Sequence, residues 1–273
     1  TALYDVRLGD DMHVLVGWGL GGGSLVNAGV SLRPDARVFA DEVWPGEIRQ
    51  DGTLDEGFRR AEAWIRPASD PRASEMTKYQ ALASAGAAFG DTTIAPRVAV
   101  SFADTVNAAG IAQTACTRCG DCCGGCNVGA KNTVALTYLP DAARHGAELY
   151  THIKVRHVAR TADGRWRVHA MRSDADKGAG AEIVIEAEMV VLAAGTLGST
   201  EILLRSREQG LAVSDRLGKR FSANGDIIAF GWGAKAPVNA VGIGHPAKLE
   251  GREIGAAVSG QIEITDAETL AHQ

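Results

Sequence analysis

Short apolar runs, broken by glycine, proline and polar turns, alternate with stretches of helical spacing along the first half of the chain. Residues 12–16 form an apolar run that ends in glycine and predicts a strand. Apolar residues recur at helical spacing in residues 54–65 and 74–89, which predicts two helices. Residues 97–102 alternate between polar and apolar, as a strand with one buried face does.

The second half begins with a helical pattern and continues as a strand meander. Residues 132–146 predict a helix broken at Pro140. Alternating runs follow, and Asp163-Gly164 provides a tight turn between the first two. These runs predict a three-stranded meander over residues 152–158, 165–171 and 182–186.

A longer apolar run occupies residues 188–195. It ends in glycine, as a buried parallel strand does, and leads into a predicted helix over residues 199–207. From about residue 226 the pattern changes to short alternating runs, at residues 226–231 and 256–264, which are typical of a mainly β domain.

These elements predict an α/β fold with α+β elements, divided into two domains. Residues 1–225 would form a Rossmann-like domain that carries the meander, and residues 226–273 would begin a mainly β domain that is cut short. The chain begins at Thr1 and not at a methionine. We therefore expect it to be an internal fragment of a longer protein.

Composition and charge narrow the class of protein. The chain has 273 residues, 45% of them hydrophobic and 22% charged, and a net charge of −5. These values are typical of a globular protein, and the scattered lysines and arginines argue against a nucleic-acid partner. No apolar run reaches the roughly 20 residues of a membrane span. Among cellular locations we favour the cytoplasm.

The most distinctive stretch is a glycine-rich loop after the first predicted strand. Gly17, Gly19 and the run from Gly21 to Gly23 allow positive φ angles and the close approach of another group. Ser24 is a candidate N-cap of a short helix, and Asn27 lies about one turn further on. Backbone N–H groups at such a helix start favour phosphates and other anionic groups.

Gly17-x-Gly19-x-x-Gly22 matches the dinucleotide-binding pattern G-x-G-x-x-G, but its surroundings differ. That pattern opens a long helix inside a βαβ unit. Here Gly29 weakens the helix and Pro34 ends it. We interpret the stretch as a cofactor loop of another kind. An NAD-binding Rossmann protein and a glycine-rich turn without a ligand remain the alternatives.

All five cysteines lie between positions 116 and 126. Four follow the C-x₂-C-x₂-C-x₃-C spacing of bacterial ferredoxins and are candidate iron–sulfur ligands: Cys116, Cys119, Cys122 and Cys126. Asn127 stands where ferredoxins usually have proline. Zinc binding, a disulfide and a turn of unligated thiols are the other interpretations. The segment alone would also suit a small electron-transfer or metal-binding module.

Three separated segments carry a resemblance to a known family. They are residues 19–30, the motif Gly129-Ala-Lys-Asn-Thr133 with Tyr138-Leu139 and the strand after it, and residues 190–205 followed by Leu217-Gly218. In sequence and in order they resemble the glucose–methanol–choline (GMC) oxidoreductases, and within these the cholesterol oxidase-like branch. Any one of the segments alone would be a weak match.

The resemblance implies an FAD-binding domain and an enzyme that oxidises the CH–OH group of a small-molecule alcohol, sterol-like or sugar-like, by hydride transfer to the flavin. It also implies cofactor contacts. Val155 matches a strand residue that lies against the adenine, and Ala194 and Gly195 match the end of a strand that passes the FAD. Ala28 replaces a family glycine, so contact there would be through the backbone. The contacts in the loop are Gly22, Gly23, Ser24, Asn27, Ala28 and Val30.

Two parts of the family pattern are expected outside the chain. The FAD-binding G-x-G-x-x-G is expected before Thr1, and the catalytic histidine with its His/Asn partner is expected beyond Gln273. No catalytic residue is therefore assigned, and the fragment alone is expected to be inactive. The electron acceptor depends on the cysteines. A cluster would pass electrons to a redox partner, as in a dehydrogenase, whereas oxygen would serve an oxidase.

Overall fold

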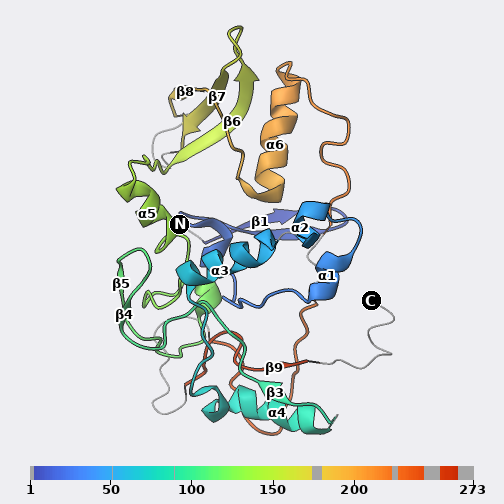
Figure 1. Cartoon of the computed structure of the whole chain (residues 1–273), viewed down its shortest axis with the longest axis vertical. Coiled ribbons are helices and arrows are strands. Elements are labelled where there is room, and N and C mark those ends of the chain that lie inside the picture. The colour runs from blue at the N-terminus through green and yellow to red at the C-terminus, as the bar shows by residue number, and fades with distance from the viewer. Residues whose placement is uncertain are drawn as a thin grey trace. The chain divides into compact units, whose positions relative to one another are not determined.

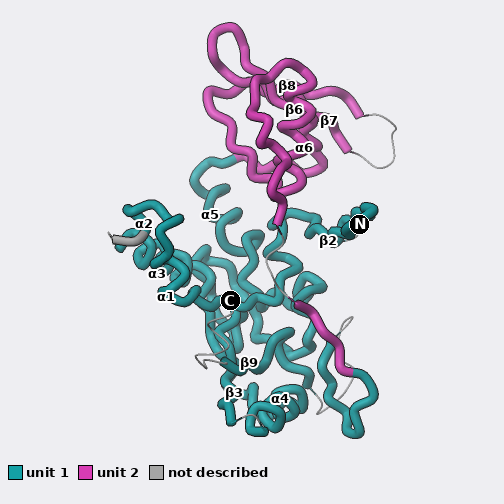
Figure 2. The backbone as a smooth tube through the Cα atoms, turned by 90° about the vertical axis from the view of Figure 1, so that its right-hand side faces the viewer, with its two compact units in different colours: residues 1–147, 232–273 teal, residues 148–231 magenta. Residues whose placement is uncertain are grey.

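A computed structural model describes residues 3–50, 52–88, 90–173, 180–222, 227–242 and 253–263. The chain divides into two compact units, which Figure 2 shows in different colours. Unit 1 comprises residues 1–147 and 232–273, and unit 2 comprises residues 148–231. Each unit contains both helices and strands, as the sequence predicts.

The amino-terminal part of unit 1 is an antiparallel hairpin (Figure 1). β1 (Tyr4–Leu8) pairs with β2 (His13–Gly17), and Leu8 stands opposite His13. β2 confirms the first predicted strand. β1 is not predicted, because its charged residues alternate with apolar side chains that stay exposed.

Three helices follow the glycine loop. α1 (Ala36–Ala40) and α2 (Gly46–Gln50) are too short to show a periodic pattern and are not predicted. α3 (Thr53–Ile65) confirms the first predicted helix. The ring of Phe39 lies edge-on to that of Phe58, with 6.2 Å between centroids, so α1 packs against α3 through aromatic side chains.

A further helix lies against a two-stranded sheet (Figure 1). The 3-10 turn η2 (Ala73–Glu75) leads into α4 (Thr77–Ala88), which confirms the second predicted helix. β3 (Thr93–Ile94) pairs antiparallel with β9 (Gln261–Ile262), and both strands contact α4. The strand predicted for residues 256–264 is confined to β9, because the described residues 256–260 form no strand.

The core of unit 1 is assembled from irregular segments. The strand predicted for residues 97–102 is reduced to isolated bridges, from Val98 to Val30 and Ala68 and from Val100 to Lys131. Single residues of this stretch therefore join several loops instead of one sheet. The buried cluster consists of Val98, Val100, Cys116, Cys122, Ala130 and Ala256.

Short elements complete unit 1. β4 (Thr105–Val106) pairs antiparallel with β5 (Ala112–Gln113), and α5 (Tyr138–Arg144) follows further along the chain. The helix predicted from residue 132 is wrong in its first half, because α5 begins at Tyr138. Pro140 does not break this helix, since it lies in the first turn, where no intrahelical N–H bond is required.

Unit 2 contains the predicted meander. β6 (Ile153–Arg160), β7 (Trp166–Arg172) and β8 (Glu182–Ala187) form an antiparallel sheet in that order. α6 (Gly195–Glu208) confirms the helix predicted after the apolar run and lies along β6 (Figure 1). The Ser206 hydroxyl accepts the N–H of Val158 at 2.9 Å, which satisfies a polar group of this edge strand.

A β-bulge shapes the first strand of this sheet. The register between β6 and β7 shifts between Val155 and His157. Val155 and Val158 consequently pair with alternate residues of β7 and share one face of the sheet. His157 stands opposite His169 on the other face, and their rings stack with 4.2 Å between centroids.

The parallel strand predicted for residues 188–195 does not form. The run reaches α6 without secondary structure, and Met189 and Val191 are 77% and 79% exposed. A strand requires a neighbour for its N–H and C=O groups. Every named strand pair in the described residues is antiparallel, and none includes this run. The class of mixed helix and strand is therefore confirmed, whereas the Rossmann-like sheet is not.

The boundary predicted near residue 226 lies outside the described residues, so the division into residues 1–225 and 226–273 stays a prediction. The strand predicted for residues 226–231 does not form over residues 227–231. Among the helices of the described residues, none has both the length and the apolar character needed to cross a membrane.

Candidate functional site

The glycine loop turns sharply into one turn of 3-10 helix, η1 (Gly22–Leu25). The chain enters this turn through Gly19 and Gly21, whose φ angles are 137° and 112°. Residues with a side chain rarely adopt such angles. Gly21 is also closely packed, because a Cβ atom there would lie 3.1 Å from the Cβ of Ala135. Glycine is thus required on this side of the loop for both reasons.

The opposite side of the loop is open. A Cβ atom at Gly22 or Gly23 would meet no heavy atom within 4 Å, and Gly23 is exposed. A flat group could therefore approach the backbone here more closely than a side chain would allow. This geometry agrees with the interpretation of the stretch as a cofactor loop.

Ser24 fastens the loop instead of capping it. The predicted N-cap role is wrong, because Gly21 occupies the N-cap position and Ser24 lies inside η1. The Ser24 hydroxyl donates to the carbonyl of Gly21 at 2.6 Å and accepts the N–H of Val134 at 2.9 Å. It thereby joins the loop to the segment that directly follows the Gly129–Thr133 motif.

Lys131 makes a second connection behind the loop. Its side chain is buried, and its ammonium donates to the carbonyls of Leu25 at 3.1 Å, Asn27 at 2.6 Å and Cys122 at 3.0 Å. Burial lowers the pKa of Lys131, but carbonyl oxygens around the ammonium favour its charged form. No role for Lys131 is predicted from the sequence. The feature that could have indicated one is a charged side chain that stands alone among small, uncharged residues of this motif.

The loop ends in a short turn that includes three of the predicted contacts. Asn27 Oδ1 accepts the N–H of Gly29 at 3.2 Å, and Val30 bridges to Val98. Within the described residues, the N–H of Ala28 has no hydrogen-bond partner. Asn27 and Val30 are exposed and Ala28 is half-buried. The structure therefore brings the six predicted loop residues together on one compact turn.

The three remaining predicted contacts lie in unit 2. Val155 stands beside the bulge of β6. Ala194 is the N-cap residue of α6, and its N–H donates to the hydroxyl of Ser199 at 3.0 Å. Gly195 is exposed with φ of 72°, and a Cβ atom there would meet nothing within 4 Å. Ala194 and Gly195 thus form a second accessible turn, at the start of a helix.

These features fit a flavin cofactor. The loop offers an open glycine backbone at Gly22 and Gly23. It also offers an unpartnered amide at Ala28 within the described residues. A flavin presents a flat face and ring edges that accept hydrogen bonds, so small residues and a backbone donor suit it. The residues of the loop therefore fit a flavin.

The cysteines behave as core residues. Cys116, Cys119 and Cys122 are buried, Cys123 is exposed, and no disulfide joins any of the five, all of which lie in the described part of the chain. The sulfur of Cys116 accepts the N–H of Arg118 at 3.3 Å. Burial raises the pKa of Cys116 to about 11 and raises that of Cys122 as well. Both thiols are therefore protonated at neutral pH and pack as small apolar groups.

The iron–sulfur site predicted for Cys116, Cys119, Cys122 and Cys126 finds no support. In the described residues, no three His, Cys, Asp or Glu side chains come together as a metal site. Spacing places cysteines in one segment but does not orient their side chains. The turn η3 (Cys122–Gly124) and positive φ angles at Arg118 and Cys126 redirect the backbone within this segment.

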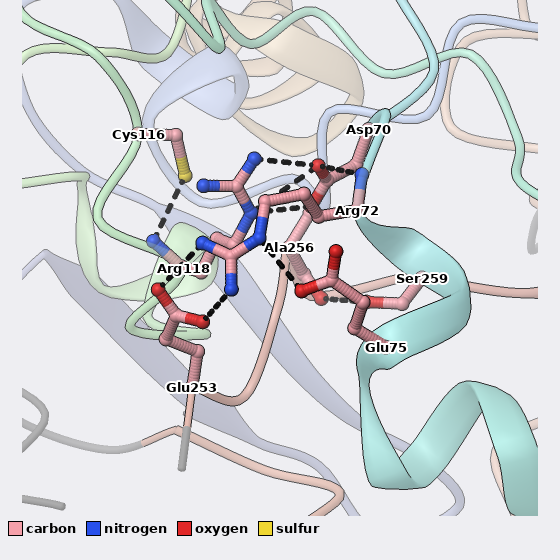
Figure 3. A network of polar contacts seen from close by, with 8 residues as sticks. All are labelled: Asp70, Arg72, Glu75, Cys116, Arg118, Glu253, Ala256 and Ser259. Carbon is pink, nitrogen blue, oxygen red and sulfur yellow. Dashed lines mark hydrogen bonds and ion pairs between the residues drawn. The ribbon is translucent and has the colours of Figure 1, made fainter. Parts of the chain in front are cut away.

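Arg118 anchors the cysteine segment in a polar network (Figure 3). Its guanidinium forms a buried ion pair with Asp70 at 2.8 Å, and its carbonyl accepts the N–H of Ile254 at 2.9 Å. Arg72, two residues from Asp70, pairs with Glu253 at 2.6 Å. Three segments far apart in sequence are thus joined. Breaking such a buried pair leaves an uncompensated charge and lowers the free energy of unfolding by about 3–5 kcal/mol. We therefore interpret the network as structural.

A protein-family model described as GMC oxidoreductase matches residues 8–224. The matched span includes the glycine loop, the motif at residues 129–133, the meander and α6. It therefore contains every residue that the sequence analysis places near a cofactor.

Curated relatives agree with this match. A cholesterol oxidase of Mycobacterium tuberculosis is 31% identical over 237 residues, which cover 80% of this chain and 40% of the relative. A cholesterol oxidase of Acinetobacter baumannii is 24% identical over 253 residues, covering 82% and 44%. An uncharacterized GMC-type oxidoreductase of Mycobacterium tuberculosis is 31% identical over 218 residues, covering 78% and 31%. The chain spans less than half the length of these relatives.

Proposed function

The chain belongs to the GMC oxidoreductase family, and from this premise we propose that the full-length protein is an FAD-dependent enzyme that oxidises an alcohol. The substrate CH–OH group would become a carbonyl, with hydride passing to the flavin. The single observation that carries the proposal is the glycine loop: its inner side is held by Ser24 and Lys131, and its outer side is open at Gly22 and Gly23.

We assign the cofactor contacts as follows. Gly22 and Gly23 offer backbone to the flavin, and Ala28 offers its unpartnered amide, since no described residue accepts it. Ser24 keeps the loop in shape through its bond to Val134. Asn27 and Val30 line the exposed side of the same turn. For Val155, Ala194 and Gly195 of unit 2, the contacts to FAD stay a prediction from the family resemblance.

The substrate class is proposed from the relatives. Two of them are cholesterol oxidases, and this favours a sterol-like alcohol over a sugar-like one. No residue of this chain is assigned as the catalytic base.

The acceptor is proposed to be oxygen or a soluble redox partner, with no iron–sulfur relay, because the thiols do not converge on a metal site among the described residues. An NAD-binding Rossmann function is not favoured, since η1 is four residues long and the next helix, α1, has only five residues.

The proposal can be tested by anaerobic reduction. The full-length protein, loaded with FAD, is mixed without oxygen with a 3β-hydroxysterol, an aldose or a short primary alcohol. Bleaching of the flavin absorbance by the sterol alone, followed by peroxide formation on admission of air, is the expected result for a sterol oxidase. If no alcohol bleaches the bound flavin, the proposed alcohol oxidation is wrong.

A further inference from the structure

The starting observation is a buried ammonium whose donors are all used. Lys131 is 1% exposed, and its Nζ donates to three backbone carbonyls, at 2.6 Å to Asn27, 3.0 Å to Cys122 and 3.1 Å to Leu25. An ammonium has three N–H donors. Lys131 therefore has no proton available for substrate or cofactor, and any part it plays is exerted through the loops it holds.

The shortest of these three bonds, at 2.6 Å, holds the peptide between Asn27 and Ala28. A trans peptide is planar, so its C=O and N–H groups point in opposite directions. The Asn27 carbonyl points inward to Lys131. The N–H of Ala28 must therefore point away from the core, and it has no partner among the described residues.

The neighbouring amides of this turn are already engaged. The N–H of Asn27 donates to the carbonyl of Gly23 at 3.0 Å, and the N–H of Gly29 donates to Asn27 Oδ1 at 3.2 Å. Of these three consecutive N–H groups, the one of Ala28 alone lacks a partner among the described residues. An unmade backbone hydrogen bond at a half-buried position is unfavourable unless a ligand or water completes it.

The surroundings of Lys131 suit a fixed charge. The titratable groups that act on it are the thiols of Cys122, Cys123 and Cys126, and burial is the largest influence on its pKa. The thiol of Cys122 is buried and stays neutral, and three carbonyl dipoles surround the ammonium. Replacement by an apolar side chain would leave inward-pointing carbonyls without a donor, and these could turn outward.

We propose that Lys131 is a positioning residue: by holding the Asn27 carbonyl, it aims the Ala28 amide at the flavin, to which that amide donates a hydrogen bond. The inference rests on the proposed function, since it requires FAD at this loop. It assigns a task to a residue of the Gly129–Thr133 motif that does not itself contact the cofactor.

The test compares buried Lys131 with half-buried Lys78 in the full-length protein. Lys78 also donates to backbone carbonyls, those of Ala256 and Ala257, which are not part of the glycine loop. Lys131→Met is expected to raise the Kd for FAD at least tenfold, while Lys78→Met lowers the melting temperature and leaves the Kd unchanged. Lys131→Arg, which keeps the charge and the donors, should bind FAD more tightly than Lys131→Met.

A second readout separates positioning from general destabilisation. At saturating FAD, the flavin reduction potential of Lys131→Met should be more negative than that of the wild type, because a donor to the reduced flavin is lost. Lys78→Met should keep the wild-type potential. If Lys131→Met is folded and matches Lys78→Met in both Kd and potential, the proposal is overturned.

A variant at half-buried Ala28 provides the test if Lys131→Met does not fold. Ala28→Pro removes the amide N–H, whereas Ala28→Gly keeps it. The proline variant should bind FAD at least tenfold more weakly than the glycine variant, and equal binding would overturn the proposal. Failure of the wild type itself to bind FAD would count against the proposed function, whereas normal binding by Ala28→Pro would count against this inference alone.

Discussion

Two stretches of this chain share one sequence pattern, an apolar run that ends in glycine and leads into a helical turn, yet they fold differently. The first, residues 12–25, forms β2 and η1, with β2 paired to β1 along its length. The second, residues 188–208, reaches α6 without pairing to any described strand, and Met189 and Val191 in its apolar run are exposed.

The two runs differ in the residues that bind them and the segments that follow them. The first is held by distant residues: the hydroxyl of Ser24 binds Val134, 110 positions away, and Lys131 binds the loop carbonyls. The apolar run of the second is held locally, since the hydroxyl of Ser199 binds Ala194 and Leu192, and the long-range bonds of this stretch, at Arg205 and Ser206, lie in α6. Apolar pattern alone therefore predicts where a strand could form, and a partner strand, which β1 provides for the first run, decides whether it does.

The largest expected difference between the two stretches concerns their glycines. Gly21→Val should lower the free energy of unfolding by roughly 3 kcal/mol or more, because it combines a left-handed φ with a contact at 3.1 Å to Ala135. Gly195→Ala should cost only about 1 kcal/mol, because its φ is unfavourable but the space around it is open.

Urea denaturation of both variants measures this difference. Equal losses of stability would show that the glycine loop is not packed more tightly than the start of α6. Gly22→Ala serves as a control inside the loop, since its φ is also positive but no atom lies near its Cβ.

A smaller effect is expected from the two serines. Ser24→Ala should lower the free energy of unfolding by about 1–2 kcal/mol, since the N–H of Val134 loses its acceptor. Ser199→Ala should cost about 0.5–1 kcal/mol, because its bonds are local and the freed groups can reach water. Chemical denaturation checks both values, and a larger loss for Ser199→Ala would contradict the account.

The pattern of apolar and polar residues predicted the elements whose structure depends on neighbouring residues. It predicted α3, α4, α6 and the meander, because helical periodicity and alternation are properties of neighbouring residues. It missed α1 and α2, which are too short for a period to appear, and β1, whose apolar side chains remain exposed. It also misplaced the start of α5, since Pro140 is compatible with a first turn.

The candidate site shows the same division. The glycine loop was located from its composition, and its resemblance to a family gave its contacts. The part played by Lys131 could not be foreseen, because its three acceptors come from two other segments of the chain. The iron–sulfur hypothesis finds no support for a related reason: spacing gives proximity along the chain, whereas Cys116 and Cys122 pack in the core with Val98, Val100 and Ala130.

The smallest expected effect concerns pH, and it is confined to unit 2. Burial, with His169 as the next cause, lowers the pKa of His157 below its usual value of 6.5. The folded state therefore binds fewer protons than the unfolded state just below pH 6.5, so the stability of unit 2 should fall as the pH falls through this range. The charged groups that face His157 are His169, Glu182, Arg156 and Arg205.

His169→Gln removes one of these influences and should flatten the pH dependence slightly. Thermal unfolding followed by circular dichroism between pH 5 and 8 measures the profiles of the wild type and of this variant, and an unchanged slope in His169→Gln would refute the coupling of the stacked rings.

The central claim is that the loop held by Ser24 and Lys131 is a flavin-binding surface. The most direct measurement is the visible absorption spectrum of the purified full-length protein, with quantification of released FAD and of iron. The account predicts a yellow protein with two flavin bands, one FAD per chain and no stoichiometric iron. A colourless protein that cannot be loaded with FAD would contradict it.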